Sequence, residues 1–341
     1  MGLFANPLSD GSGFALVVWL PLSAARSALA VRFTPAYRLR PMAVVPISPD
    51  RQRLPAWFKR SLPDHGTSAE TNAIVRSHGL VTVCEEATCP NRQECWSKKA
   101  ATFMLMGDTC TRTCTFCDVK YARVPPPLDP TEPQRLADAV GELGLRFVVV
   151  TSVNRDDLPG HGASHFAATI AALRKRDSAL LIEVLTPDFC GDAAAISTVV
   201  TARPDVYNHN LETIPRLYPT VRPQAKYQRS LDLLKSVKAQ DPTILTKSGI
   251  MVGLGETDDE VRHLMDDLVA HNVDIFTIGQ YLRPSLEHHD IIRFVTPEQF
   301  SIYETWGKAA GFKYVASGPY VRSSYFAEEV MAGAIAMPGK R

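Results

Sequence analysis

Short runs of apolar and β-branched residues recur along the chain after residue 100 and predict strands. The first run lies at 103–106, and later runs occupy 146–153, 180–185, 205–211, 244–252 and 274–281. Runs of this length that are rich in Val and Ile and separated by polar segments are typical of strands. We therefore expect a sheet built from this part of the chain.

Helical patterns separate these runs. The clearest begins at Thr257-Asp258-Asp259-Glu260, which has the form of a capping box, and apolar residues then recur on one helix face through Val269. A second start is Thr296-Pro297-Glu298-Gln299, with a cap residue and a proline in the first turn, and another helix opens near Thr131. Strands that alternate with helices at this spacing predict parallel βα units.

Periodicity does not separate a closed barrel, a partial barrel and an open doubly wound sheet. In each of these folds, ligands gather at the carboxyl ends of the parallel strands. The segment from Cys110 to Cys117 follows the first predicted strand directly. We therefore expect these cysteines at the ligand-binding edge of the sheet.

Composition is that of a soluble enzyme with one large core. The chain has 341 residues, is 45% hydrophobic and carries a formal net charge of +1. Nothing in this charge balance suggests nucleic acid or anionic lipid as a partner, and we expect neither nucleic acid nor membrane binding.

Six of the seven cysteines form two close triplets, Cys84, Cys89 and Cys95, then Cys110, Cys114 and Cys117. A structural zinc site is nearly always closed by four ligands, and disulfides need an oxidising compartment. Odd-numbered sets instead favour iron–sulfur clusters, in which three thiolates leave one iron open to another ligand. Zinc or incidental clustering remains the alternative, chiefly for the first triplet. Cys190 is predicted to be a small buried apolar residue.

The second triplet, with Phe116 before its last cysteine, gives the pattern C-x-x-x-C-x-aromatic-C. In this pattern the chain resembles the radical S-adenosylmethionine (SAM) enzymes. The first triplet and the string Arg322-Ser323-Ser324-Tyr325 make it similar to the lipoyl synthase family, over about residues 55–332. Strings at 153–158, 208–213 and 248–256 support the resemblance. It departs at Pro159-Gly160-His161-Gly162, where Pro-Asp-Gly-Gly is expected.

The resemblance implies an α/β fold, a partial (β/α)6 TIM-type barrel of the radical SAM type with N-terminal and C-terminal extensions. We expect four segments: a disordered or transit-like extension at 1–49, an N-terminal wrap at 50–100 with the first triplet, the barrel at 101–320, and a C-terminal segment at 321–341. Trp57, Phe58 and Leu62 are expected to anchor the wrap.

The resemblance also implies the chemistry and its ligands. A 4Fe-4S cluster on Cys110, Cys114 and Cys117 would cleave SAM to give a 5′-deoxyadenosyl radical, which suits an unactivated C–H bond. A second, auxiliary 4Fe-4S cluster would donate sulfur to the sixth and eighth carbons of a protein-bound octanoyl-lysine. Its implied ligands are Cys84, Cys89, Cys95 and a serine oxygen, assigned by motif position to Ser324, with Ser323 as the alternative.

Residues that contact SAM are harder to assign. Phe116 is expected near the adenine, while Asn154, Glu212 and Arg222 lie at or after strand ends and could hold the ribose or the methionyl carboxylate. Each could equally be a satisfied structural polar group. The nine histidines show no helical metal-ligand spacing, and His288-His289 is expected to be an exposed pair.

The implied partners are octanoylated lipoyl-carrier domains of 2-oxoacid dehydrogenase complexes, the glycine cleavage H protein, and a low-potential electron donor such as ferredoxin or flavodoxin. Residues 1–49 contain four arginines, no lysine and one acid. They are expected to be a disordered extension, an artefact if Met42 is the true start, or a transit peptide to a plastid or mitochondrion. Without a transit peptide, we expect a cytoplasmic protein.

Two other hypotheses remain open. One is a different radical SAM sulfur transferase, such as a biotin-synthase-like or methylthiolating enzyme. The other is a non-catalytic iron–sulfur carrier or zinc-stabilised protein, which predicts metal binding without SAM cleavage and leaves the large βα body unexplained.

Overall fold

The computed structural model describes residues 6–7, 14–15, 53–59, 65–325 and 327–329. The chain divides into two units, Met1–Leu54 and Pro55–Arg341. In the first unit, β1 (Asn6–Pro7) pairs antiparallel with β2 (Phe14–Ala15). The predictions for Met42 and for Leu62 fall outside the described residues.

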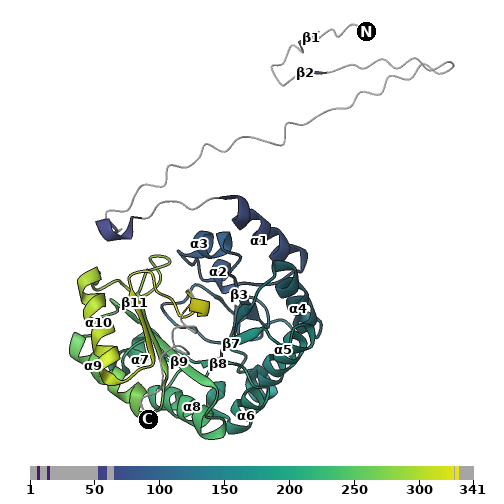
Figure 1. Cartoon of the computed structure of the whole chain (residues 1–341). Coiled ribbons are helices and arrows are strands. Elements are labelled where there is room, and N and C mark those ends of the chain that lie inside the picture. Colours follow the sequence, from purple (N-terminus) through teal and green to yellow (C-terminus); the bar gives the residue numbers. More distant parts are fainter. Residues whose placement is uncertain (1–5, 8–13, 16–52, 60–64, 326, 330–341) are drawn as a thin grey trace, which may run out of the picture. The chain divides into compact units, whose positions relative to one another are not determined.

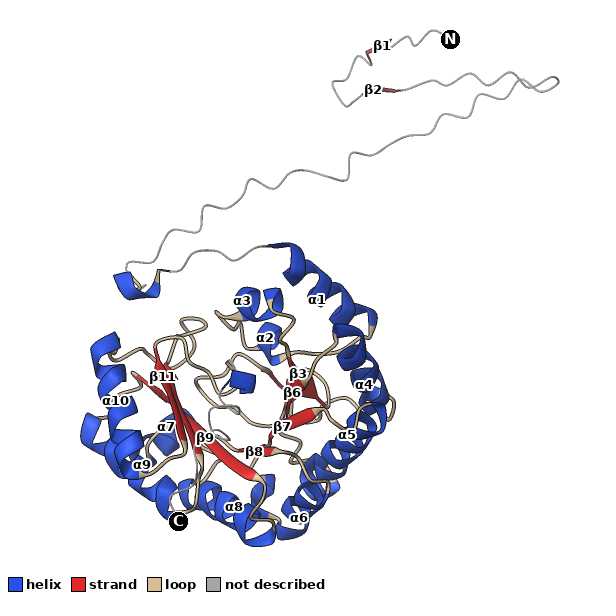
Figure 2. Ribbon diagram, viewed as in Figure 1, coloured by secondary structure: helices blue, strands red, loops and turns tan. Residues whose placement is uncertain are grey.

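Within the described part of the second unit, the main sheet has seven strands in the order β11-β10-β9-β8-β7-β6-β3. Every neighbouring pair is parallel. Figures 1 and 2 show the strands curved around a central space with helices outside them, which is a partial barrel. The strands are β3 (Thr102–Leu105), β6 (Phe147–Ser152), β7 (Leu181–Leu185), β8 (Val206–Asn208), β9 (Leu245–Val252), β10 (Ile275–Gln280) and β11 (Tyr314–Gly318).

Helices connect successive strands and bury apolar faces against the sheet. They are α4 (Glu132–Leu143), α5 (Ala163–Arg176), α6 (Ala193–Thr201), α7 (Tyr218–Val221), α8 (Tyr227–Gln240), α9 (Asp258–Ala270) and α10 (Pro297–Ala310). Three 3₁₀ turns lie in the same connections: η2 (Pro159–Gly162), η3 (Phe189–Gly191) and η4 (Pro215–Leu217). A small two-stranded ladder joins β4 (Thr109–Cys110) to β5 (Lys120–Tyr121). The prediction of parallel βα units is confirmed.

The predicted helix starts are also confirmed. The Thr257 hydroxyl accepts a hydrogen bond from the Glu260 amide, and the Glu260 carboxylate accepts one from the Thr257 amide, so α9 begins with a full capping box. The Thr296 side chain caps α10 by accepting from the Gln299 amide. These starts were visible in the sequence because each cap depends on residues only three positions apart.

The strand that the hydrophobic pattern did not predict is β11. It pairs with β10 on one side only, so it is an edge strand. Among its residues only Val315 is buried. An edge strand needs fewer apolar residues than a central one, which explains the weak pattern.

The segments before β3 and after β11 pack against each other on the open side of the barrel. The segment before β3 contains η1 (Ala56–Phe58), α1 (His65–Ser77), α2 (Val83–Glu86) and α3 (Arg92–Ser97). The Phe58 ring packs edge-on against Tyr320, whose hydroxyl donates to the Phe58 carbonyl at 2.5 Å, and Asn91 Nδ2 donates to the Tyr320 carbonyl at 2.7 Å. Phe58 is therefore an anchor as expected, whereas Trp57 is exposed.

The C-terminal segment enters the barrel. Ser323 Oγ accepts a hydrogen bond from Asn210, which follows β8 at its carboxyl end. A few residues later, Ala327 is buried against Val149 and Val206, and Glu328 lies 3.6 Å from Arg146 just before β6. Residues 323–325 thus lie at the carboxyl ends of the strands, and residues 327–328 lie nearer their amino ends.

Candidate active site

The Cys110–Cys117 loop lies at the carboxyl ends of the strands, as the sequence predicted. Backbone hydrogen bonds tie it to three other connections. The Thr111 amide donates to the Asn154 carbonyl at 3.1 Å, after β6, and the Thr115 amide donates to the Val221 carbonyl at 3.0 Å, after β8. The His289 amide donates to the Thr115 carbonyl at 2.9 Å, after β10. The loop is therefore fixed over the barrel mouth and not merely attached to β4.

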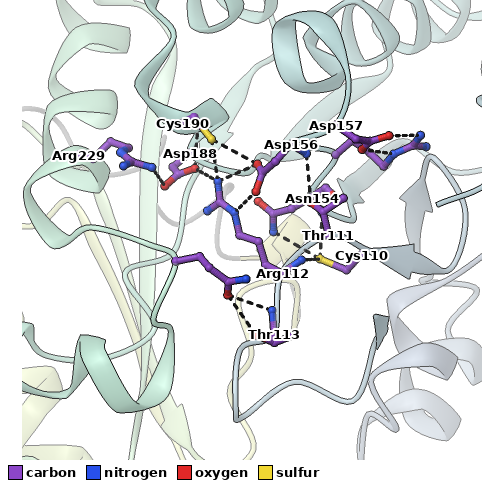
Figure 3. Close-up of polar contacts among 12 residues, drawn as sticks. Cys110, Thr111, Arg112, Thr113, Asn154, Asp156, Asp157, Asp188, Cys190 and Arg229 are labelled. Carbon is purple, nitrogen blue, oxygen red and sulfur yellow. Dashed lines mark hydrogen bonds and ion pairs between the residues drawn. The ribbon is translucent and has the colours of Figure 1, made fainter. Parts of the chain in front are cut away.

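The thiol of Cys110 accepts several N–H groups. The amides of Arg112 and Asn154 lie 3.4 and 3.3 Å from its Sγ, and Asn154 Nδ2 lies 3.8 Å away (Figure 3). Hydrogen bonds to cysteine sulfur are one of the means by which proteins stabilise and tune iron–sulfur clusters. The arrangement fits a thiolate that carries negative charge at this position.

The other two thiols of the loop, those of Cys114 and Cys117, belong to half-buried residues. Burial raises the pKa of Cys114 to about 11 and that of Cys117 to about 12, and the neighbouring thiols add to both shifts. For Cys114, the Arg222 guanidinium acts in the opposite direction. Because a metal ligand must be deprotonated, binding of iron here releases protons. Three converging thiols with a cation nearby fit a 4Fe-4S cluster.

A buried ion-pair network lies beneath the loop (Figure 3). The side chain of Arg112, only 3% exposed, places Nε 2.6 Å from Asp156 Oδ2 and Nη2 2.6 Å from Asp188 Oδ1. Arg229 of α8 donates to the other Asp188 oxygen at 3.0 Å. Burial opposes ionisation of Asp188, but Arg112 outweighs it and holds the pKa of that carboxyl well below its ordinary value. Sequence analysis did not single out Arg112, although its place between two cysteines was visible.

The predicted SAM-binding residues Asn154, Glu212 and Arg222 meet around the same mouth. Asn154 Oδ1 and Arg222 Nε are buried and have no hydrogen-bond partner among the described residues. Burial raises the pKa of the Glu212 carboxyl, and Arg222 acts against that rise. Asn210 Oδ1, which sequence analysis missed, is also without a partner in the described chain. Buried polar atoms left open in this way fit a polar, charged ligand.

Phe116 lies half-buried between Cys114 and Cys117 and packs against the hydrophobic core. Its contact with an adenine stays a prediction.

The first triplet lies on α2, on α3 and in the loop between them. Cys84 belongs to α2 and is buried, Cys89 follows in the connecting loop, and Cys95 belongs to α3. Burial raises the pKa of the Cys84 thiol and takes that of Cys95 to about 12, with further contributions from the other thiols of the triplet. The thiols of this triplet are thus near enough to influence one another electrostatically, which suits a second cluster.

The C-terminal string lies beside this triplet. The Tyr325 hydroxyl donates to the Glu94 carboxylate at 3.1 Å, one residue before Cys95. Ser323 is occupied by its hydrogen bond from Asn210 Nδ2, at 3.2 Å, and Ser324 lies between Ser323 and Tyr325. The assignment of Ser324 as a cluster ligand stays a prediction. The next residue, Tyr325, contacts Glu94 beside Cys95.

Two sequence interpretations are wrong. Cys190 is exposed, not buried, because the chain turns at η3 with a left-handed φ of 53° and carries Cys190 out of the core while Phe189 fills it. His288 is not an exposed ring. Its side chain is 17% exposed, and Nε2 lies 3.2 Å from the Cys117 carbonyl oxygen. Both residues therefore belong to the mouth of the barrel.

His209 gives a prediction for the pH dependence of stability. Its ring is buried between the Thr186 carbonyl and the Ser230 hydroxyl, at 2.8 and 2.9 Å. Burial, together with Arg222, lowers its pKa from 6.5 to about 4. Between these values the unfolded chain binds a proton that the folded protein does not, so stability is present above pH 6.5 and falls as the pH drops toward 4.

As the pH falls across this interval, we expect the unfolding free energy of the wild type to drop on the order of 3 kcal/mol more than that of the His209→Gln variant. Urea denaturation of both proteins at several pH values measures this difference. Carboxylates that titrate in the same pH range contribute equally to both proteins, so their contribution cancels in the difference. Parallel pH profiles for the two proteins would contradict the argument.

No helix in the part of the chain that the structure describes is both long enough and apolar enough to span a membrane.

Comparison with known proteins agrees with this site. Residues 104–268 match the radical SAM superfamily model. The fold is similar to crystal structures of Streptococcus suis SuiB, one bound to the precursor peptide SuiA and one bound to S-adenosylmethionine, with TM-scores of 0.51 and 0.50 at 11% identity. These matches cover 73% and 67% of this chain, and the chain spans 52% and 55% of the SuiB chains. Because the identity is only 11%, they show the fold alone.

The barrel, the cysteine loop and these matches define a radical SAM enzyme, which uses SAM and a 4Fe-4S cluster. The chain is 54% identical over 292 residues to the lipoyl synthase of Rubrobacter xylanophilus, covering 85% of this chain and 91% of that protein. It belongs to the lipoyl synthase family.

Proposed function

We propose that the protein inserts two sulfur atoms into a protein-bound octanoyl-lysine, at the sixth and eighth carbons, to form lipoyl-lysine. The observation that carries the proposal is the meeting of three segments at one barrel mouth. The string Arg322-Ser323-Ser324-Tyr325 bonds through Tyr325 to Glu94, beside the first triplet, and through Ser323 to Asn210 after β8. The connection after β8 also holds the cysteine loop, because the Thr115 amide donates to the Val221 carbonyl.

Cys110, Cys114 and Cys117 would hold the 4Fe-4S cluster that supplies the electron for SAM cleavage. The Asn154 side-chain amide and the Arg112 amide steady the Cys110 sulfur, while Arg222 places a positive charge near Cys114. The open Arg222 Nε and Asn154 Oδ1 are suited to the carboxylate and to the hydroxyl groups of SAM respectively. Glu212 is suited to the amino group of SAM because its carboxylate is an acceptor close to Arg222.

Cys84, Cys89, Cys95 and Ser324 would hold a second 4Fe-4S cluster, the source of the sulfur. A hard serine oxygen is a weaker ligand than thiolate on such a cluster, which suits a group that must come apart during the reaction. Glu94 accepts from Tyr325 next to Cys95, so it holds the serine string against this triplet.

The proposed protein substrates are octanoylated lipoyl-carrier domains of 2-oxoacid dehydrogenase complexes and the glycine cleavage H protein. The proposed electron donor is a low-potential ferredoxin or flavodoxin, and the proposed location is the cytoplasm. These assignments rest on family membership.

The test is anaerobic loading of the full chain with iron and sulfide, followed by incubation with SAM, a low-potential reductant and an octanoyl-lysine peptide. We expect mass spectrometry to find two added sulfurs on the peptide together with 5′-deoxyadenosine. If deoxyadenosine forms but the peptide gains no sulfur, the radical chemistry stands and this substrate is rejected. If fully loaded protein gives neither product, the result favours an iron–sulfur carrier. Ser324→Ala and Ser323→Ala form a matched pair, of which only the first should stop sulfur insertion.

A further inference from the structure

Three side chains outside both cysteine triplets bring a carboxylate, an imidazole and a thiol together. Asp156 follows β6, His161 lies in η2, and Cys190 lies in η3 after β7. One ligand atom from each lies within 4.8 Å of the other two. Thiolate, imidazole and carboxylate are the three ligand types that zinc accepts in proteins.

Each of the three groups has bonding capacity suited to an ion. His161 Nδ1 is buried and has no hydrogen-bond partner among the described residues. The Cys190 thiol donates to Asp156 Oδ1 at 3.4 Å, so a proton now occupies the space between this sulfur and this oxygen. A buried ring nitrogen left open beside a thiol and a carboxylate is costly unless a ligand completes it.

Asp156 is already oriented by a neighbour. Arg112 donates to both Asp156 oxygens, from Nε at 2.6 Å and from Nη2 at 2.9 Å. Metal-ligating carboxylates are commonly held in this way by hydrogen bonds from an outer residue. The same Nη2 lies 3.3 Å from Cys190 Sγ. Burial and Asp156 raise the pKa of the Cys190 thiol, and the Arg112 charge acts against that rise, so the thiolate forms when the ion binds.

We propose that Asp156, His161 and Cys190 form a binding site for one divalent transition-metal ion of the zinc type. The Cys190 S–H bond breaks, its proton passes to solvent, and the sulfur electron pair binds the ion, so no oxidant or reductant is needed. Two negative ligands then balance the two charges of the ion. Because Cys190 is exposed, water can enter and fill a fourth position.

Backbone geometry provides a clean variant. His161 has a left-handed φ of 52°, a conformation that glycine adopts without strain. His161→Gly therefore removes the imidazole and also removes the backbone strain of the left-handed conformation. A loss of metal binding in this variant would not come from unfolding. Cys190→Ser removes the sulfur with little change in shape. His263→Gln, on exposed α9 surface, is the matched histidine control.

The test uses the full chain with iron and sulfide loaded, to which zinc chloride is added. Elemental analysis counts zinc per chain, and absorption spectroscopy at the zinc edge reads its ligands independently of iron. We expect one zinc with one sulfur neighbour and nitrogen or oxygen otherwise. His161→Gly and Cys190→Ser should weaken binding at least about 100-fold, beyond the ~10–100-fold typical of losing an outer-shell partner.

His263→Gln should bind zinc as the wild type does. Equal zinc binding in all three variants, several sulfurs around the zinc, or no zinc at all would each overturn the proposal. Since the readout is zinc and not lipoyl formation, failure of this site would leave the proposed function untouched.

Discussion

Cys110→Ala is expected to abolish SAM cleavage, whereas Cys89→Ala is expected to retain cleavage and lose sulfur insertion. The two cysteines belong to different triplets on different parts of the fold. Cys110 lies in the loop whose sulfur is steadied by Asn154 and Arg112, while Cys89 lies between α2 and α3. A cluster with only two thiolates is poorly held, so each substitution should remove one cluster and spare the other.

The measurement is paired quantification of 5′-deoxyadenosine and of sulfur on an octanoyl-lysine peptide, with iron content determined for each variant. Retained iron in both variants would show that the remaining cluster is intact. Equal loss of SAM cleavage in the two variants would falsify the division of labour between the triplets.

Arg112→Met is expected to destabilise the protein by roughly 3–5 kcal/mol, the range found when one partner of a buried ion pair is removed. The Arg112 side chain is 3% exposed and bridges Asp156 to the fully buried Asp188. Arg229 would remain on Asp188, which places the expected loss toward the lower end of this range. Denaturant unfolding of the metal-free protein measures the difference.

The same substitution should loosen the cysteine loop, because Arg112 ties it to the connections after β6 and β7 (Figure 3). We expect faster iron release from the second triplet and an altered electron paramagnetic resonance spectrum of its reduced cluster. Arg112→Lys should recover part of the stability, since lysine keeps the charge but not the forked geometry. An unchanged spectrum and iron release rate in Arg112→Met would reduce the role of Arg112 to fold stability alone.

The C-terminal segment connects the two candidate cluster sites physically. Ser323 bonds to Asn210, which also donates to Glu212 at 3.1 Å, on the side of the SAM-binding residues. Two residues further on, Tyr325 bonds to Glu94 beside Cys95. Three consecutive residues of one segment therefore contact the surroundings of both candidate sites.

Much of the fold was predictable because its determinants are local. Apolar runs marked six of the seven strands of the main sheet described in the structure, and the Thr257 and Thr296 caps marked helix starts. The cysteine triplets were equally visible, since each is contained in a short stretch of sequence. The edge strand β11 was missed because half-burial leaves little pattern to detect.

The sequence by itself determined the parallel βα architecture and the two sets of thiols, since both follow from residues close together along the chain. Only the tertiary structure decided which distant side chains share a site. Arg112 meets Asp188, and Asp156 meets His161 and Cys190, because parallel strands bring the loops at their carboxyl ends to one edge. No periodicity records such a meeting, because it depends on strand order and on the turns at η2 and η3.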